Sequence, residues 1–301
     1  MERLRILSNL ASASSGILDS HELSRKINRT HRNSVLKWLF ESLDLLRVED
    51  SVFFATVLLA DRYCCRVDLN RKLEGADLQL VILASLCCSL KVVDTSVDLS
   101  VKAFLEHVSG GHVDPKDIFQ TEARLLKALE FDAFIPSLSD FVTSFYEALC
   151  DDCSCTKSPL EQELAKIQLP YEVMKQQEMA KFLLYLTVLD VERLHSMTLP
   201  RLVAGCILSG AWIVNTSMNY TRSPEAAFQV STIADCLVDA GWLCESDDCL
   251  SIIHETTAFW EDMVGKPTDA VDSLKRLFGS KEKLEVSKLK LLTTRVLSGG
   301  G

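Results

Sequence analysis

The chain has 301 residues, of which 48% are hydrophobic and 25% charged, with 12 glycines and 7 prolines. This length is sufficient for two domains with separate cores, and the scarcity of Gly and Pro favours helices over a turn-rich β-sandwich. The formal net charge of −10 argues against a nucleic-acid partner, because binding to phosphates requires a basic surface.

Helical spacing of the apolar residues predicts a series of helices in the first half of the chain. A short N-terminal helix is expected over residues 18–27. The helices that follow are predicted over residues 30–46, 50–63, 78–93, 99–108 and 115–129. The run 78–93 is apolar on almost every face, so we expect neighbouring helices to pack around it on all sides.

The same pattern repeats in the second half of the chain. Helices are predicted over residues 136–149, 179–189, 200–214, 226–238 and 249–263. The third of these is again apolar all round. The sequence therefore predicts an all-α fold of two tandem five-helix domains, each built around a buried third helix.

The expected domain boundaries follow from this repeat. We assign residues 1–29 to an N-terminal segment, 30–135 and 136–264 to the two domains, and 265–301 to a partly disordered C-terminal tail. The apolar runs 78–93 and 199–214 are shorter than the roughly 20 residues that cross a bilayer, so no membrane partner is expected.

Cysteine usage bears on the compartment and on metal binding. Eleven cysteines, an odd number, follow an N-terminus that lacks the apolar core of a signal peptide. This combination indicates an intracellular location, in the nucleus, the cytoplasm or both. Cys150, Cys153 and Cys155 lie close together, but no second Cys/His pair accompanies them, and we expect neither a metal nor a cofactor.

No catalytic grouping stands out in the sequence. It has no G-x-S-x-G elbow, no Gly-rich phosphate loop and no H-E-x-x-H motif, so an enzyme is the least favoured class. Two charges in apolar helices are more informative, namely Lys91 and Glu122. They could grip an external backbone through its C=O and N–H groups, although on spacing alone the favoured interpretation is that both face solvent.

Several motifs in one frame resemble the cyclin family. Residues 31–41 read HRNSVLKWLFE and are similar to the R-x-x-x-x-x-W-L-x-E opening of the cyclin box. LADRY at 59–63, LQLV at 78–81 with Lys91 ten residues later, EARLLKALEFD at 122–132 and LPRLVAG at 199–205 resemble later segments. The likeness covers residues 30–262. It leans weakly toward the mitotic A/B-type cyclins.

The resemblance implies two cyclin boxes and a role for particular residues. The kinase-binding residues would be Lys91, Glu122, Val92 and Phe131. In the family, the Lys and Glu matching Lys91 and Glu122 bond the main chain beside the mobile C-helix of a cyclin-dependent protein kinase. Arg32 and Asp61 would form a structural pair inside the fold.

The resemblance also implies a docking patch for substrate or inhibitor peptides, centred on Trp38. Its residues would be His31, Ser34, Val35, Trp38, Glu41, Leu78 and Gln79. His31 and Ser34 stand where larger apolar residues are usual in the family, and Val92-Val93 replaces an aromatic residue. Simple core packing of Trp38 is the alternative.

The resulting hypothesis is a non-catalytic subunit that binds and activates a cyclin-dependent kinase in cell-cycle control. Two alternatives stay open. One is a cyclin-fold scaffold that activates nothing, and the other is a transcription-type cyclin-box protein, against which the acidic balance counts.

Overall fold

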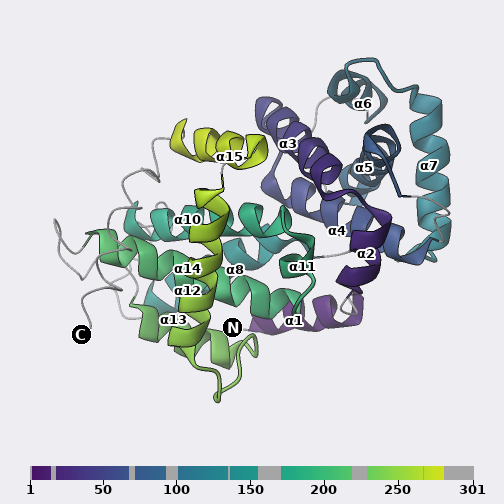
Figure 1. Ribbon diagram of the computed structural model, residues 1–301. Coiled ribbons are helices and arrows are strands. Elements are labelled where there is room, and N and C mark those ends of the chain that lie inside the picture. Colours follow the sequence, from purple (N-terminus) through teal and green to yellow (C-terminus); the bar gives the residue numbers. More distant parts are fainter. Residues whose placement is uncertain are drawn as a thin grey trace. The chain divides into compact units, whose positions relative to one another are not determined.

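The computed structural model describes residues 2–14, 18–67, 72–92, 101–134, 136–154, 171–218, 229–266 and 268–280. Within these ranges the protein is all-α, and the only β-type pairing is a single bridge between Ile27 and Leu73 (Figure 1). The helices are α1 (Glu2–Ser14), α2 (Ser20–Lys26), α3 (Arg29–Leu45), α4 (Asp50–Arg66), α5 (Gly75–Val92), α6 (Val101–Ser109), α7 (Pro115–Ala128), α8 (Leu138–Ser154), α10 (Tyr171–Val188), α11 (Val191–Leu194), α12 (Leu199–Met218), α13 (Val230–Asp239), α14 (Cys249–Gly265) and α15 (Asp269–Ser280).

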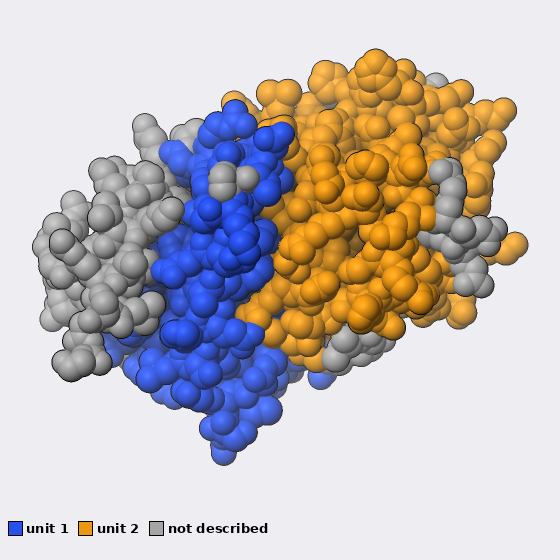
Figure 2. Space-filling view, viewed as in Figure 1, with its two compact units in different colours: residues 1–9, 141–186, 199–301 blue, residues 10–140, 187–198 orange. Residues whose placement is uncertain are grey.

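The chain divides into two compact units, which Figure 2 shows in different colours. Unit 1 consists of residues 1–9, 141–186 and 199–301, and unit 2 of residues 10–140 and 187–198. Unit 2 therefore combines α2–α7 with the short helix α11 from much later in the chain.

Helix α5 is the central helix of unit 2. It packs against α3, α4, α6 and α7, and every residue from Val81 to Leu90 is buried. Aromatic contacts continue this core between α3 and α4, where the ring centroids of Phe40 and Phe53 lie 6.2 Å apart. The prediction of a helix surrounded by its neighbours is confirmed.

The helix boundaries in unit 2 have local causes. Asn28 caps α3 by accepting hydrogen bonds from the backbone N–H groups of Thr30 and His31. Asp114 caps α7, whose first residue is Pro115, a position where the missing N–H costs nothing. These caps set the start of the two helices that carry Arg32 and Glu122.

Unit 1 is built around α12, which packs against α13 and α14. A Cβ at Gly210 would lie 2.9 Å from the backbone nitrogen of Ala180, so only glycine allows α12 and α10 to approach this closely. Residues 75–92 of α5 and 199–216 of α12 are long and apolar enough to span a membrane, but 61% and 78% of these windows are buried inside the protein.

Helices α1 and α15 were not predicted from the sequence. The start of α1 is anchored where the indole N–H of Trp242 donates to the carbonyl of Leu4. In the predicted tail, α15 buries Phe278 against Phe182 and Tyr185, with ring centroids 5.2 and 5.6 Å apart. Residues 281–301, the rest of that tail, lie outside the described residues.

Candidate functional site

Lys91 and Glu122 meet at the surface of unit 2. The Nζ of Lys91, in the last turn of α5, lies 2.6 and 2.8 Å from the two carboxylate oxygens of Glu122 on α7. The Glu122 side chain is only 8% exposed, whereas that of Lys91 is 48% exposed. The pair therefore presents its cation to solvent and keeps its carboxylate inside.

Two thiols complete the surroundings of this carboxylate. The Sγ atoms of Cys87 and Cys88 lie 3.3 Å from Oε2 and 3.6 Å from Oε1 of Glu122. Burial, and then the negative charge of Glu122, raise the pKa of each thiol to about 12. Both cysteines are therefore protonated at neutral pH and can act as hydrogen-bond donors.

The same contacts keep the ammonium of Lys91 protonated. Its partial burial alone would lower the pKa of the ammonium, but the hydrogen bond to Glu122 raises this pKa above its ordinary value. The ammonium also lies 5.7 Å from the ring centroid of Phe119, within the range of a cation–π contact. Lys91 is thus a fixed positive charge beside an aromatic ring.

Exposed apolar side chains accompany the pair. Val92 follows Lys91 directly and is exposed, and Phe119 lies one turn before Glu122 on α7 with its ring partly exposed. Phe131 is 75% exposed in the turn after α7 and has a left-handed backbone, with φ of 64°. Val93, the other atypical residue of this segment, lies outside the described residues.

Arg32 and Asp61 form a second pair, deep inside unit 2. The guanidinium Nη2 lies 2.8 Å from Oδ2 of Asp61, and both side chains are almost fully buried, at 2% and 3% exposed. Arg32 also donates to the carbonyl of Val188, and the Nε2 of His195 lies 3.1 Å from Oδ2 of Asp61. The pair thus ties α3 and α4 to the segment 187–198.

These partners keep the carboxylate of Asp61 ionised. Burial alone would raise the pKa of this carboxyl, but the Arg32 guanidinium and the bond to His195 hold the pKa below its usual value. The sequence did not predict His195, because nothing in a lone histidine 134 positions away signals a contact with Asp61. The only pointer was that a buried carboxylate requires several partners.

The residues of the implied docking patch differ in their exposure. Leu78 and Val35 are buried, Trp38, His31 and Gln79 are half-buried, and Ser34 and Glu41 are exposed. Glu41 is also paired with Lys37 one turn away on α3, at 3.0 Å. Trp38, His31, Gln79 and the two polar residues are therefore accessible to solvent, whereas Leu78 and Val35 belong to the core.

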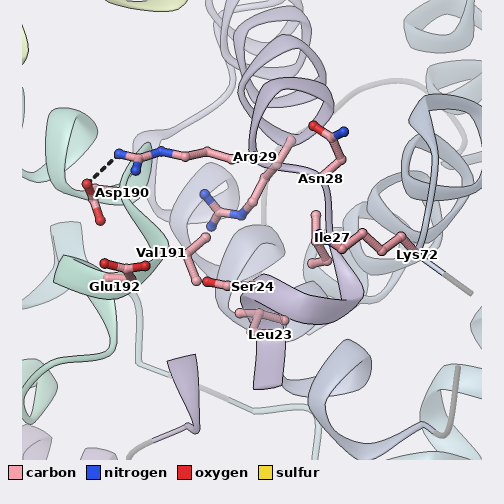
Figure 3. Close-up of a pocket in the computed structure, with 10 residues that line it drawn as sticks. Leu23, Ser24, Ile27, Asn28, Arg29, Lys72, Asp190, Val191 and Glu192 are labelled. Carbon is pink, nitrogen blue, oxygen red and sulfur yellow. Dashed lines mark hydrogen bonds and ion pairs between the residues drawn. The ribbon is translucent and has the colours of Figure 1, made fainter. Parts of the chain in front are cut away.

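A separate pocket in unit 2 has a cavity volume of about 250 Å³ (Figure 3). It lies between the end of α2, the start of α3 and residues 190–192, and Arg29 forms an ion pair with Asp190 at its rim. Its lining includes the apolar residues Leu23, Ile27 and Val191, and also Arg32. None of the residues predicted for kinase or peptide binding lines it.

No group of three His, Cys, Asp or Glu side chains that could hold a metal occurs in the described part of the chain. Helix α8 continues through Ser154, beyond the end predicted at residue 149. Cys155 lies outside the described residues, and the side chain of Cys153 is also not described.

Comparisons with known proteins agree with this architecture. Residues 5–133 match the family model of the cyclin N-terminal domain. G2/mitotic-specific cyclin-2 of Medicago sativa is 29% identical over 122 residues, which are 40% of this chain and 35% of that protein. Cyclin-B2-1 of Arabidopsis thaliana is 28% identical over 129 residues, 43% of this chain and 29% of that protein.

The matched segments thus span about a third of the length of these relatives. Among solved structures, a viral cyclin from herpesvirus saimiri aligns with a TM-score of 0.57 at 16% identity, over 87% of this chain and 97% of the viral protein. The fold is therefore the all-α cyclin fold. The family match and the relatives support the cyclin family, with weak similarity to mitotic cyclins.

Proposed function

We propose that this chain, with its cyclin fold and its cyclin-family matches, is a regulatory subunit that binds and activates a cyclin-dependent protein kinase. The observation that carries the proposal is the half-exposed ammonium of Lys91, held by a buried carboxylate beside exposed apolar side chains. The acidic charge balance and the similarity to mitotic cyclins support a cell-cycle role over a transcription-type one.

The geometry supports different roles for Lys91 and Glu122 in the proposed contact. An ammonium has three N–H donors, and two of those of Lys91 go to the oxygens of Glu122. The ammonium therefore keeps donor capacity for a backbone carbonyl of the kinase. Glu122, buried and already accepting from Lys91 and from two thiols, orients Lys91 and has little surface left for the partner.

Apolar contacts would supply most of the binding free energy. Val92, Phe119 and Phe131 are exposed large hydrophobic side chains on α5, on α7 and just after α7. Burial of such side chains stabilises a complex by roughly 25 cal/mol per Å². The ion pair would then fix the register of the contact, because charged hydrogen bonds contribute more to specificity than to affinity.

Activation would follow from selective binding. An active kinase requires its C-helix glutamate to pair with the active-site lysine. A partner that binds only this conformation shifts the kinase population toward it, by an amount equal to its differential affinity for the two states. In this mechanism the chain contributes no catalytic group, and its location would be that of the kinase, in the nucleus, the cytoplasm or both.

Peptide docking at Trp38 is the finer part of the proposal. The half-buried Trp38 and Gln79 and the exposed Ser34 leave a mixed polar and aromatic surface on unit 2. Substrate or inhibitor peptides bound there would be brought close to the kinase. Replacement of Trp38 by alanine would then lower the phosphorylation of docking-dependent substrates more than that of a short peptide substrate.

The main experiment measures histone phosphorylation by purified cyclin-dependent kinases mixed with this protein, and the size of any complex. The variants are Lys91→Ala and Glu122→Ala. Lys266→Ala is the matched control, because Lys266 is an exposed lysine of unit 1 that is ion-paired with Asp262. Both site variants should weaken stimulation by about tenfold or more, which corresponds to loss of a charged hydrogen bond.

The outcomes of this experiment distinguish the proposed kinase contact from the scaffold alternative. Stimulation that survives both site variants would remove Lys91 and Glu122 from the proposed contact. Binding without stimulation would favour the scaffold alternative. A stable complex should bury about 1,600 Å² or more, the size of a standard interface.

A further inference from the structure

Cys87 and Cys88 lie in the apolar run of α5, where cysteine is ordinarily a core residue, and the structure places both against Glu122. Each thiol faces a different oxygen of one carboxylate, Cys87 at 3.3 Å from Oε2 and Cys88 at 3.6 Å from Oε1. Both thiols are within hydrogen-bonding distance of the carboxylate. Each oxygen of Glu122 therefore has one thiol and the ammonium of Lys91 as neighbours.

We propose that Cys87 and Cys88 are positioning residues for the Lys91–Glu122 pair, whose thiols hold the buried carboxylate in the orientation that chelates Lys91. The inference rests on the proposed kinase-binding function of that pair. It adds a role for two side chains that are themselves buried and cannot touch the kinase.

The helix geometry explains why these two positions suit the role. Residues three and four positions apart lie on the same face of a helix, so Cys87 and Cys88 precede Lys91 on one face of α5. Glu122 enters this face from α7, which packs against α5. The carboxylate thus lies between thiol donors on its inner side and the ammonium on its outer side.

The chemistry explains why thiols serve as donors here. A buried carboxylate that lacks donors is costly, and one ammonium that is half exposed cannot satisfy all of its lone pairs. Because burial and Glu122 raise the pKa of both thiols to about 12, the S–H protons stay in place at every physiological pH. Apolar side chains at these positions would leave the carboxylate free to turn away from Lys91.

The first test measures thiol reactivity and needs no kinase. The folded protein is treated briefly with iodoacetamide at pH 8.5, and alkylation is read by mass spectrometry after digestion with trypsin. Cleavage after Lys72 and Lys91 releases Cys87 and Cys88 together, or cleavage after Lys72 and Lys102 where Lys91 is replaced. Cleavage after Arg62 and Arg66 releases Cys64 and Cys65 as an internal control.

The contact predicts the direction of the change in each variant. Glu122→Gln removes a charge that raises the pKa of both thiols, so their alkylation should accelerate about threefold or more, since the thiolate fraction changes tenfold per pKa unit. Lys91→Met removes a charge that lowers their pKa, so alkylation should slow down. The rate at Cys64 and Cys65 should stay constant, because their principal acidic neighbour is Asp61.

The second test measures the affinity for the kinase by calorimetry. The double variant Cys87→Ala, Cys88→Ala removes both donors and should weaken binding about fivefold, whereas Cys87→Ser, Cys88→Ser keeps hydroxyl donors and should bind within about twofold of the wild type. Cys64→Ala is the control for a buried thiol of unit 2 on a different helix, α4.

The outcomes separate this inference from the proposed function. Equal affinity of the wild type and the double alanine variant, or equal alkylation of Cys87 and Cys88 in the wild type and Glu122→Gln, would overturn the positioning role. If the wild type binds no kinase, the proposed function fails, but the alkylation rates still decide whether the thiols hold Glu122. If the alanine variant does not fold, the serine variant and the alkylation rates retain the test.

Discussion

Unit 2 contains two acid–base pairs of similar chemistry that differ in their surroundings. Arg32 and Asp61 are both shielded from water, and every partner of the pair belongs to the same unit. In the other pair, Glu122 is shielded but Lys91 is half exposed. An almost fully buried pair serves the fold, whereas an ammonium held at the surface by a buried carboxylate can also serve a partner.

The difference in burial also changes the expected balance of stability and binding. Removal of one member of an enclosed pair leaves a charge without compensation, which is strongly destabilising. Removal of the half-exposed Lys91 lets water take the place of its ammonium beside Glu122, whose carboxylate still has two thiol donors, so the loss of stability should be smaller. Stability and kinase affinity should therefore respond in opposite order to changes at the two pairs.

The largest effect is expected for Asp61→Asn. It leaves the Arg32 guanidinium buried without a counter-charge, and we expect the free energy of unfolding to fall by about 3–5 kcal/mol. Urea denaturation followed by circular dichroism would measure it. The double variant Arg32→Met, Asp61→Leu should lose less than the single variant, because it leaves no buried charge. A greater loss in the double variant would contradict this account.

The contribution of the Arg32–Asp61 pair to stability should be lost in acid. The pKa of Asp61 is lowered in the folded protein, so its contribution to stability is complete above its ordinary value near ~3.9 and is lost as the pH falls through the lower folded value. The difference in stability between the wild type and Asp61→Asn should be constant from pH 7 to 5 and shrink below about pH 4. A difference that grows in acid would mean that the folded pKa is raised.

A smaller loss is expected for His195→Phe. The substitution keeps a ring of similar size but removes the hydrogen bond from Nε2 to Asp61, which still has Arg32 as a partner. We expect a loss of about 1–3 kcal/mol in urea denaturation. His254→Phe is the control, since His254 is exposed on α14. Equal losses in the two variants would show that the bond to Asp61 contributes nothing.

Periodicity predicted those parts of the fold in which apolar spacing dominates. The all-α fold is confirmed, and α5 was predicted to within a few residues because its apolar run is almost continuous. Helix α15 was not predicted because the tail is rich in Lys and Glu, and its composition outweighed the helical spacing of Val271, Leu274 and Phe278. Whether such a stripe packs depends on the partner surface, which the local sequence does not contain.

Only some residues of the two charged pairs and their surroundings could be predicted from the sequence. Lys91 and Glu122 were singled out as charges in apolar helices, and the structure brings them into contact, while their role toward a kinase stays a prediction. The roles of Cys87, Cys88 and His195 could not be read from the sequence. Small polar contacts with a distant carboxylate depend on tertiary packing, and cysteine in an apolar run is ordinarily a core residue.

The smallest effect on stability is expected for Lys91→Met. Because Lys91 is half exposed, we expect a loss of at most about 1 kcal/mol at pH 7. The raised pKa of Lys91 means that its contribution is present below the ordinary value near ~10.4 and is lost as the pH rises through the higher folded value. The two pairs should thus fail at opposite ends of the pH range.

Urea denaturation of the wild type and Lys91→Met at pH 7 and above pH 10.5 would measure this contribution, with Lys266→Met as the control for an exposed ion-paired lysine. The decisive comparison is with kinase affinity measured on the same samples. If Lys91→Met lowers stability as much as Asp61→Asn does, the ammonium is part of the structural framework. If it leaves stability nearly unchanged but weakens kinase binding about tenfold, the exposed end of this pair acts on the partner rather than on the fold.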